Sequence, residues 1–227
     1  MSLGIIRVLT TEDDRILGEH GRMLHAQYGI ASFTRCIPDQ ASGIFDAPSE
    51  ARAIPKILAL GRQMRDAGAK ALFLSCAADP GLSALRETVG IPVVSAGSAA
   101  ARVAALLDRP VAVMGIGENA PAPFRSLLGE DVLYARPEGV KKTTDLLTPE
   151  GRQASLETAR RLHTQGIQVI AFSCTGFSTI GLAGQIRAHV GAVAIDAVTA
   201  AGMFAVEMLG AAARARSDIG SKARGLQ

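Results

Sequence analysis

An internal repeat constrains the fold of this chain more than any other feature of its sequence. The segment GAKALFLSC at residues 68–76 corresponds to GIQVIAFSC at residues 166–174, and each apolar run ends in Ser-Cys. A second pair, GIPVVSAGS at 90–98 and GAVAIDAVT at 191–199, follows in the same order. Each segment reads as a buried strand that runs into a helix. The repeat therefore predicts two similar units, each of which presents one cysteine at the end of a strand.

Short apolar runs alternate with longer amphipathic ones along the chain. Strands are expected at 4–9, 30–37, 71–74, 91–94, 110–116, 132–135, 169–172 and 192–195. Helices are expected at 13–27, 48–67, 82–89, 98–107, 121–128 and 149–165. A further helix is expected to end near residue 189, and the last helix is expected to begin at residue 198. Pro55 either splits the second helix or delays its start. This order predicts the α/β class, with two pseudo-symmetric, flavodoxin- or Rossmann-like three-layer units, parallel sheets and an active site in the cleft between them.

Composition supports a packed α/β protein and excludes several functions. Hydrophobic residues make up 48% of the chain, while aromatic residues make up only 4% and Trp is absent. Ala, Val, Ile and Leu must then form the core, which suits buried parallel strands and does not suit a protein that stacks nucleic-acid bases on aromatic rings. The formal charge of +3 comes from the tail at 211–227, which is expected to be a frayed or disordered end. The neutral body gives no reason to expect a nucleic-acid partner.

The sequence predicts a cytoplasmic protein without a membrane partner. The first ten residues lack the long apolar region of a secretory signal, and no apolar stretch is long enough to span a bilayer. The three cysteines form no disulfide framework, so reduced thiols are expected. Ala-rich helices make a homo-oligomer plausible.

Cys76 and Cys174 are the candidate catalytic residues. Ligands bind outside the carboxyl ends of strands in open α/β sheets, so two facing units would place these thiols on opposite walls of one cleft. Asp79 with Pro80 is expected to begin the helix after Cys76, and Ser178 or Thr179 the helix after Cys174. A nearby helix N-terminus would lower the pKa of each thiol. One thiolate could then remove a proton beside a carbonyl while the opposite thiol supplies one to the other face.

Less reactive interpretations compete with this one. Either cysteine alone could be a small buried hydrophobe, and a redox pair is possible although no Cys-x-x-Cys motif exists. Cys36 has no partner in the repeat and is expected to be structural. The four histidines show no metal-ligand spacing, so no metal is expected, and surface or packing roles are expected for His20, His25, His163 and His189. Gly115 and Gly117 do not complete a dinucleotide fingerprint.

Loops after the first strand of each half supply further candidates. Thr10 and Thr11 follow one of these strands, and Glu118 with Asn119 follows the other. They could contact a small-molecule ligand, and helix capping explains them equally well. Asp196, after the last strand, either contacts the cleft or caps the final helix.

The cysteine segments resemble those of a known enzyme superfamily. SCAADPGL at 75–82, with Leu85-Arg86-Glu87 and the later IPVV, resembles the first cysteine segment of hydantoin racemases. SCTG at 173–176 resembles the second cysteine segment of the wider aspartate/glutamate racemase superfamily. The resemblance implies cofactor-independent proton transfer between the two cysteines, with substrate contacts from the flanking residues Ser75, Ala77, Thr175 and Gly176. It also implies a first domain of residues 1–96 plus a returning helix at 198–227, and a second domain of 97–197.

Departures from the superfamily bear on the substrate. Glutamate racemases carry Asn-Thr after the first cysteine and a histidine soon after the second, where this chain has Ala77-Ala78 and Gly176-Phe177. Phe33 and Phe177 would favour a ring-shaped substrate if they face the cleft. The expected function is a racemase or epimerase acting on a hydantoin-like or amino-acid-derived compound. The alternatives are a maleate-isomerase-like cis/trans isomerase and a non-catalytic module that binds a small ligand.

Overall fold

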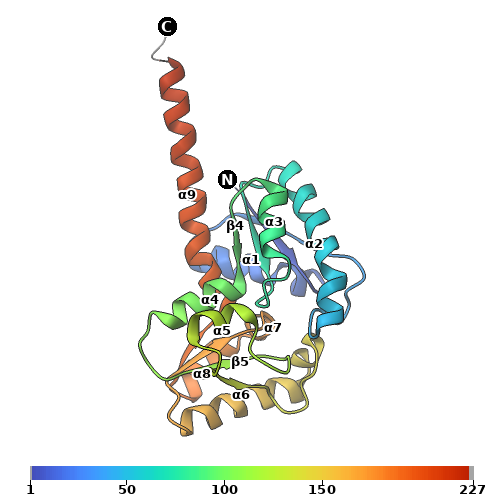
Figure 1. The fold of residues 1–227 in the computed structure, drawn as a ribbon, viewed down its shortest axis with the longest axis vertical. Helices are drawn as coiled ribbons and strands as arrows, with labels where there is room; N and C mark the ends of the chain where they lie inside the picture. The colour runs from blue at the N-terminus through green and yellow to red at the C-terminus, as the bar shows by residue number, and fades with distance from the viewer. Residues whose placement is uncertain (1, 225–227) are drawn as a thin grey trace.

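Two four-stranded parallel sheets form the centres of two units in the computed structural model, which describes the backbone of residues 2–224 and side chains as far as residue 211 (Figure 1). The first sheet has the order β2-β1-β3-β4 and the second the order β6-β5-β7-β8. The strands are β1 Leu3–Arg7, β2 Ser32–Cys36, β3 Ala71–Ser75, β4 Val93–Ser95, β5 Val111–Met114, β6 Leu133–Ala135, β7 Val169–Phe172 and β8 Val193–Ile195. Corresponding strands hold corresponding places, so the predicted pair of similar α/β units is confirmed.

Helices connect the parallel strands and cover the sheets. They are α1 Asp14–Tyr28, α2 Ala47–Asp66, α3 Leu82–Val89, α4 Ala96–Ala105, α5 Ala122–Leu128, α6 Pro149–Thr164, α7 Gly176–Thr179, α8 Leu182–His189 and α9 Ala197–Arg224. A 3₁₀ helix, η1 Thr143–Leu147, and the short α7 were not expected as separate elements. Helix α2 continues through Pro55, and its start is fixed because Asp46 and Ser49 cap each other's backbone N–H groups.

Helix α9 begins at the end of the second sheet and packs against the first unit. The Asp196 carboxylate accepts hydrogen bonds from the N–H groups of Val198 and Thr199, so Asp196 caps this helix. The Tyr28 hydroxyl of α1 donates to the carbonyl of Thr199, and Gly202 lies against the Tyr28 ring. The helical backbone continues to Arg224, while the side chains of 212–227 lie outside the described residues, so the expectation of a frayed tail stays a prediction. The domain boundaries stay a prediction.

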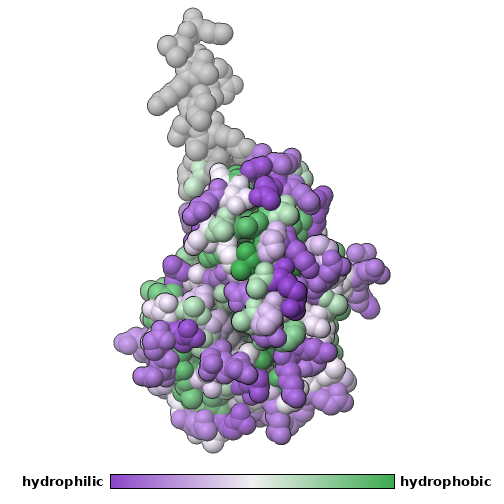
Figure 2. Space-filling view, turned by 45° about the vertical axis from the view of Figure 1, so that its right-hand side comes forward, coloured by the Kyte–Doolittle hydropathy of each residue, from purple (hydrophilic) through white to green (hydrophobic). Residues whose placement is uncertain are grey.

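The largest core cluster contains side chains from both units. Leu3 and Phe73 of the first sheet share it with Val113 and Val169 of the second, and Ala201 of α9 belongs to it. Packing between the units therefore continues the packing within each of them. The face in Figure 2 carries mainly polar side chains with smaller apolar groups between them. Within the described residues, no helix is long and apolar enough to cross a membrane.

Candidate active site

Cys76 and Cys174 line the same small cavity. Each follows the carboxyl end of a corresponding strand, β3 or β7, and both are buried, with 7% and 8% of their surface exposed. The cavity has a volume of about 40 Å³. Its other lining residues are Arg7, Val8, Leu9, Ile44, Ser75, Ala77, Ala78, Ile116, Thr143, Ser173 and Thr175. The two sulfur atoms therefore share one enclosed space between the units.

A larger cleft of about 790 Å³ adjoins this cavity. Ile44, Ala78, Ile116 and Ser173 line both of them. Glu118, with Asn119, lines the larger cleft and not the space around the cysteines. The lining of this larger cleft also includes the charged side chains of Asp46, Glu50 and Arg136.

The pKa values of both thiols lie above the ordinary value, and burial is the main cause. The pKa of Cys174 is raised to about 11, although the Gly176 N–H, the Thr143 hydroxyl and the charge of Arg7 all lower it. The Gly176 N–H donates to Cys174 Sγ over 3.4 Å. Burial raises the pKa of Cys76 further, against a weaker lowering by the Ala78 N–H. The expectation that both pKa values fall below the ordinary value is wrong, because burial outweighs the N–H groups, and Cys174 is the more readily ionised thiol.

The helices after the two cysteines begin at different distances from them: α7 begins at Gly176, directly after the turn of Cys174, while α3 begins only at Leu82. Helices α3 and α8 follow Gly81 and Gly181, which adopt left-handed φ angles of 62° and 67°. Asp79 does not cap α3; its carboxylate accepts from the N–H groups of Gly97 and Ser98 at the start of α4. Gly97 is needed there because a Cβ atom would collide with the carbonyl oxygen of Ala77. The turn after Cys76 is thus held by α4.

Arg7 is a cavity residue that the sequence analysis missed. Its guanidinium is buried at the end of β1, and Nη1 donates to the carbonyl of Ile16 over 2.8 Å. Burial lowers the pKa of Arg7 to about 10, while the charge of Cys174 acts in the opposite direction. The sequence signal that points to Arg7 is its position as the single charged residue within the apolar run at 3–9. Ile44, Ile116 and Thr143 come from loops or η1 and carry no comparable signal.

The predicted substrate-binding residues separate into two groups. Ser75, Ala77 and Thr175 line the cysteine cavity, and the Thr175 hydroxyl donates to the Ser75 carbonyl over 3.3 Å, which joins the two cysteine turns. Gly176 does not line the cavity, but its N–H meets Cys174 Sγ. Thr10 and Thr11 are not brought to the cavity.

These two threonines hold the loops around them instead. The Thr10 hydroxyl donates to the carbonyl of Ile37 and accepts from the Gln40 N–H, while Thr11 Oγ1 accepts from the Asp13 N–H. Their side-chain oxygens therefore satisfy backbone groups, and the capping alternative describes them better than ligand binding.

Other expectations have mixed outcomes. Phe177 is buried in the second core against Phe172, and Phe33 packs on another core cluster, so neither supplies the expected lining. Cys36 Sγ lies 3.8 Å from the Thr11 carbonyl oxygen, outside the cavity. His20 is fully buried. Among the described residues, no group of three or more His, Cys, Asp or Glu side chains could hold a metal ion.

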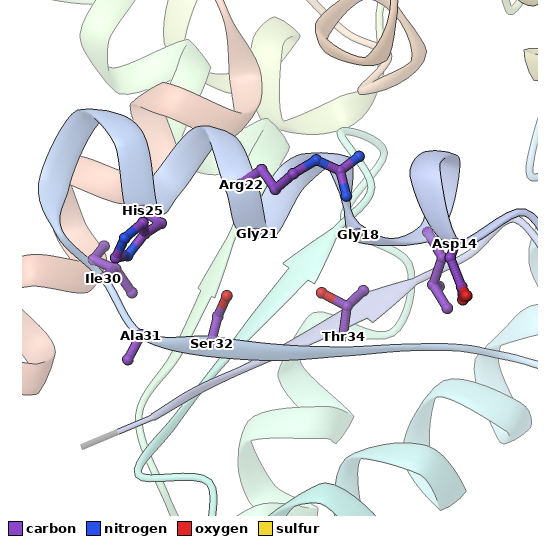
Figure 3. A pocket seen from close by; sticks show the side chains of 10 residues that line it. Asp14, Gly18, Gly21, Arg22, His25, Ile30, Ala31, Ser32 and Thr34 are labelled. Carbon is purple, nitrogen blue, oxygen red and sulfur yellow. The ribbon is translucent and has the colours of Figure 1, made fainter.

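A separate hollow lies between α1 and the edge strand β2 (Figure 3). Gly18 and Gly21 face Ser32 and Thr34 across it, and its volume is about 580 Å³. The exposed side chain of His25 lies at one end. This hollow shares no lining residue with the cysteine cavity.

Comparison with known proteins identifies the family. The sequence profile described as Asp/Glu/Hydantoin racemase matches residues 19–205. The chain belongs to this family. A hydantoin racemase of Rhizobium meliloti is 28% identical over 183 residues, which cover 76% of this chain and 74% of that protein. Family membership confirms the resemblance seen in the cysteine segments and the expectation of an isomerase.

Solved structures of family members share the fold. An allantoin racemase from Klebsiella pneumoniae superposes with a TM-score of 0.78 and 24% identity, covering 93% of this chain and 88% of that one. An allantoin racemase from Pseudomonas fluorescens gives a TM-score of 0.74 and 22% identity, covering 92% and 91%. The two parallel sheets therefore form the fold of the racemase family.

Proposed function

We propose that the protein is a cofactor-independent racemase or epimerase that uses Cys76 and Cys174 as an acid/base pair. The observation that carries this proposal is that both thiols, from corresponding positions in the two units, line one small cavity. A carbon held between them presents opposite faces to the two sulfur atoms. That arrangement suits exchange of a proton on one face for a proton on the other.

The reaction requires one thiolate and one thiol. The thiolate takes the proton from the carbon beside a carbonyl, and the electron pair moves into the carbonyl to form an enolate. The opposite thiol then donates its proton to the other face, which restores the carbonyl and leaves that sulfur as the thiolate. Cys174 is the thiolate of the more readily formed enzyme state, because the Gly176 N–H, Thr143 and Arg7 favour its charge. The enzyme alternates between two protonation states as it turns over the two enantiomers.

The proposed substrate is a five-membered hydantoin-like ring substituted at the carbon that racemises. The relatives named as hydantoin and allantoin racemases support this class. The walls near the thiols include Val8, Leu9 and Ile116, which suit a ring better than a free ammonium group. The larger cleft with Glu118 would hold the substituent.

Deuterium incorporation tests this proposal. A single enantiomer of a 5-substituted hydantoin, or of allantoin, is incubated with the protein in D₂O and followed by NMR and optical rotation. We expect loss of rotation together with one deuterium at the inverted carbon. Cys76→Ala and Cys174→Ala should each lower the inversion rate by about 10²–10⁴-fold, the usual contribution of a general acid or base. Cys36→Ala, outside the cavity, is the matched control and should retain the wild-type rate.

Other outcomes would point to other functions. Absorbance change with maleate, without deuterium at carbon, would indicate a cis/trans isomerase. Ligand binding that survives both alanine substitutions, without turnover of any hydantoin or amino acid, would indicate a binding module. Inversion that persists in either variant at the wild-type rate would contradict the two-cysteine mechanism.

A further inference from the structure

His20 contacts both cysteine turns without lining the cavity between them. Its ring is fully buried, and each ring nitrogen lies near one hydroxyl. Nδ1 is 2.7 Å from Ser75 Oγ, and Nε2 is 3.0 Å from Thr179 Oγ1. Ser75 directly precedes Cys76, and Thr179 ends the short helix α7 that follows the turn of Cys174. One side chain of α1 thus connects the two halves of the proposed site.

A closed circuit of hydrogen bonds passes through His20. The Thr179 hydroxyl donates to the carbonyl of Thr175, and the Thr175 hydroxyl donates to the carbonyl of Ser75. Ser75 and Thr179 both return to His20 through their own hydroxyls. The circuit therefore fixes the residue before Cys76 relative to the residue after Cys174.

One arrangement of protons gives every member of this circuit a partner. With the Thr179 hydroxyl proton on the Thr175 carbonyl, Thr179 Oγ1 accepts from a protonated Nε2 of His20. A neutral imidazole has one N–H, and Nδ1 therefore accepts from the Ser75 hydroxyl. Burial and the nearby charge of Arg7 hold the pKa of His20 well below its ordinary value, so the neutral ring is the form present. All members of the circuit are then satisfied at once.

We infer that His20 is a positioning residue that sets the Cys76 turn against the Cys174 turn, and with them the separation of the two thiols. This inference rests on the proposed function for its catalytic meaning. Removal of a proton requires one thiolate beside the substrate carbon. Inversion additionally requires the second thiol at the opposite face within the lifetime of the enolate. A shift between the two turns should therefore impair inversion more than exchange with retention.

Three substitutions of His20 test its contact with Ser75 and its contact with Thr179 separately. His20→Leu removes both ring contacts. His20→Asn keeps an acceptor near the Nδ1 position for Ser75, and His20→Gln keeps a donor near the Nε2 position for Thr179. His25→Leu is the matched control, because His25 is an exposed residue of the same helix and faces the separate hollow over β2 (Figure 3).

The kinetic test compares exchange with inversion in D₂O, using one enantiomer of a 5-substituted hydantoin. For His20→Leu we expect kcat for inversion to fall while KM changes little, and the ratio of exchange with retention to inversion to rise about tenfold or more. Asn and Gln should give intermediate ratios, and His25→Leu the wild-type ratio. Partial unfolding would lower both rates equally and leave the ratio unchanged, so an unchanged ratio in His20→Leu overturns the inference.

A second measurement requires no substrate. Amide hydrogen exchange reports on the turns through the N–H of Asp79, bonded to the Cys76 carbonyl, and the N–H of Phe177, bonded to the Cys174 carbonyl. Both amides should exchange faster in His20→Leu than in the wild type or in His25→Leu. Unchanged protection in both turns overturns the positioning role even if the enzyme racemises its substrate. Absence of turnover in the wild type, by contrast, counts against the proposed function and leaves this readout valid.

Discussion

At the residue scale, the two cysteines are equivalent by repeat and unequal by environment. Both are buried to a similar degree, but Cys174 has three groups that favour its charge and Cys76 has one weaker group. The sequence suggests two groups of similar pKa, since both follow an apolar strand. The inequality arises from Arg7 and Thr143, which lower the pKa of Cys174, together with the charges of Asp79 and Glu50, which raise the pKa of Cys76.

Alkylation measures this inequality directly. Thiolates and not thiols react with iodoacetamide, so the thiol with the lower pKa reacts faster at a given pH. In a Cys36→Ser background at pH 9 we expect Cys174 to be modified before Cys76, at a rate that rises with pH towards about 11. Peptide mass spectrometry over time gives both rates. Earlier modification of Cys76 would contradict the assigned order.

His20 should make stability depend on pH. The ring stays neutral in the folded protein, while in the unfolded chain it binds a proton below its ordinary pKa of 6.5. Stability is therefore present above that pH and is lost as pH falls below it, by at most about 1.4 kcal/mol per pH unit for one proton. Urea unfolding of wild type and His20→Gln between pH 7.5 and pH 5 should show a smaller slope for the variant. The buried acids Asp79 and Asp196 contribute to both proteins and cancel in the difference.

At the element scale, the positions of the strands along the chain and the repeated Ser-Cys ends follow from the sequence, while several helix starts do not. The apolar runs locate the eight strands of the two sheets, because buried parallel strands are continuous apolar segments. Asp79 was assigned to the wrong helix because a carboxylate can cap any helix start within reach, and contact with α4 depends on tertiary packing. The cavity residues Ile44 and Thr143 were missed for the same reason, since loops carry no periodicity.

Two glycines provide a matched test of how α4 holds the Cys76 turn. Gly97→Ala would drive a methyl group into the Ala77 carbonyl, so we expect a loss of about 1–3 kcal/mol in unfolding free energy and a clear loss of inversion rate. Gly184→Ala, in α8, has open space around the added methyl group and should stabilise by about 0.5–1 kcal/mol. Thermal unfolding and D₂O inversion assays check both. A fully active Gly97→Ala variant would show that the α4 contact does not hold the turn.

At the scale of the whole molecule, the two units should behave as one cooperative body. They share a core cluster and the hydrogen bond from Thr175 to Ser75. The two tyrosines report separately, because Tyr28 belongs to α1 in the first unit and Tyr134 to β6 in the second. In Tyr28→Phe and Tyr134→Phe variants, urea transitions followed by the remaining tyrosine should coincide with each other and with circular dichroism. Two separated transitions would contradict a shared core.

The central claim is that Cys76 and Cys174 act on opposite faces of one carbon. The most direct measurement is α-deuterium exchange of each pure hydantoin enantiomer by the two single-cysteine variants in D₂O. Cys76→Ala should exchange only the enantiomer whose proton faces Cys174, Cys174→Ala should exchange only its mirror image, and neither should invert its substrate at an appreciable rate. Exchange of the same enantiomer by both variants, or rapid inversion by either, would contradict the claim.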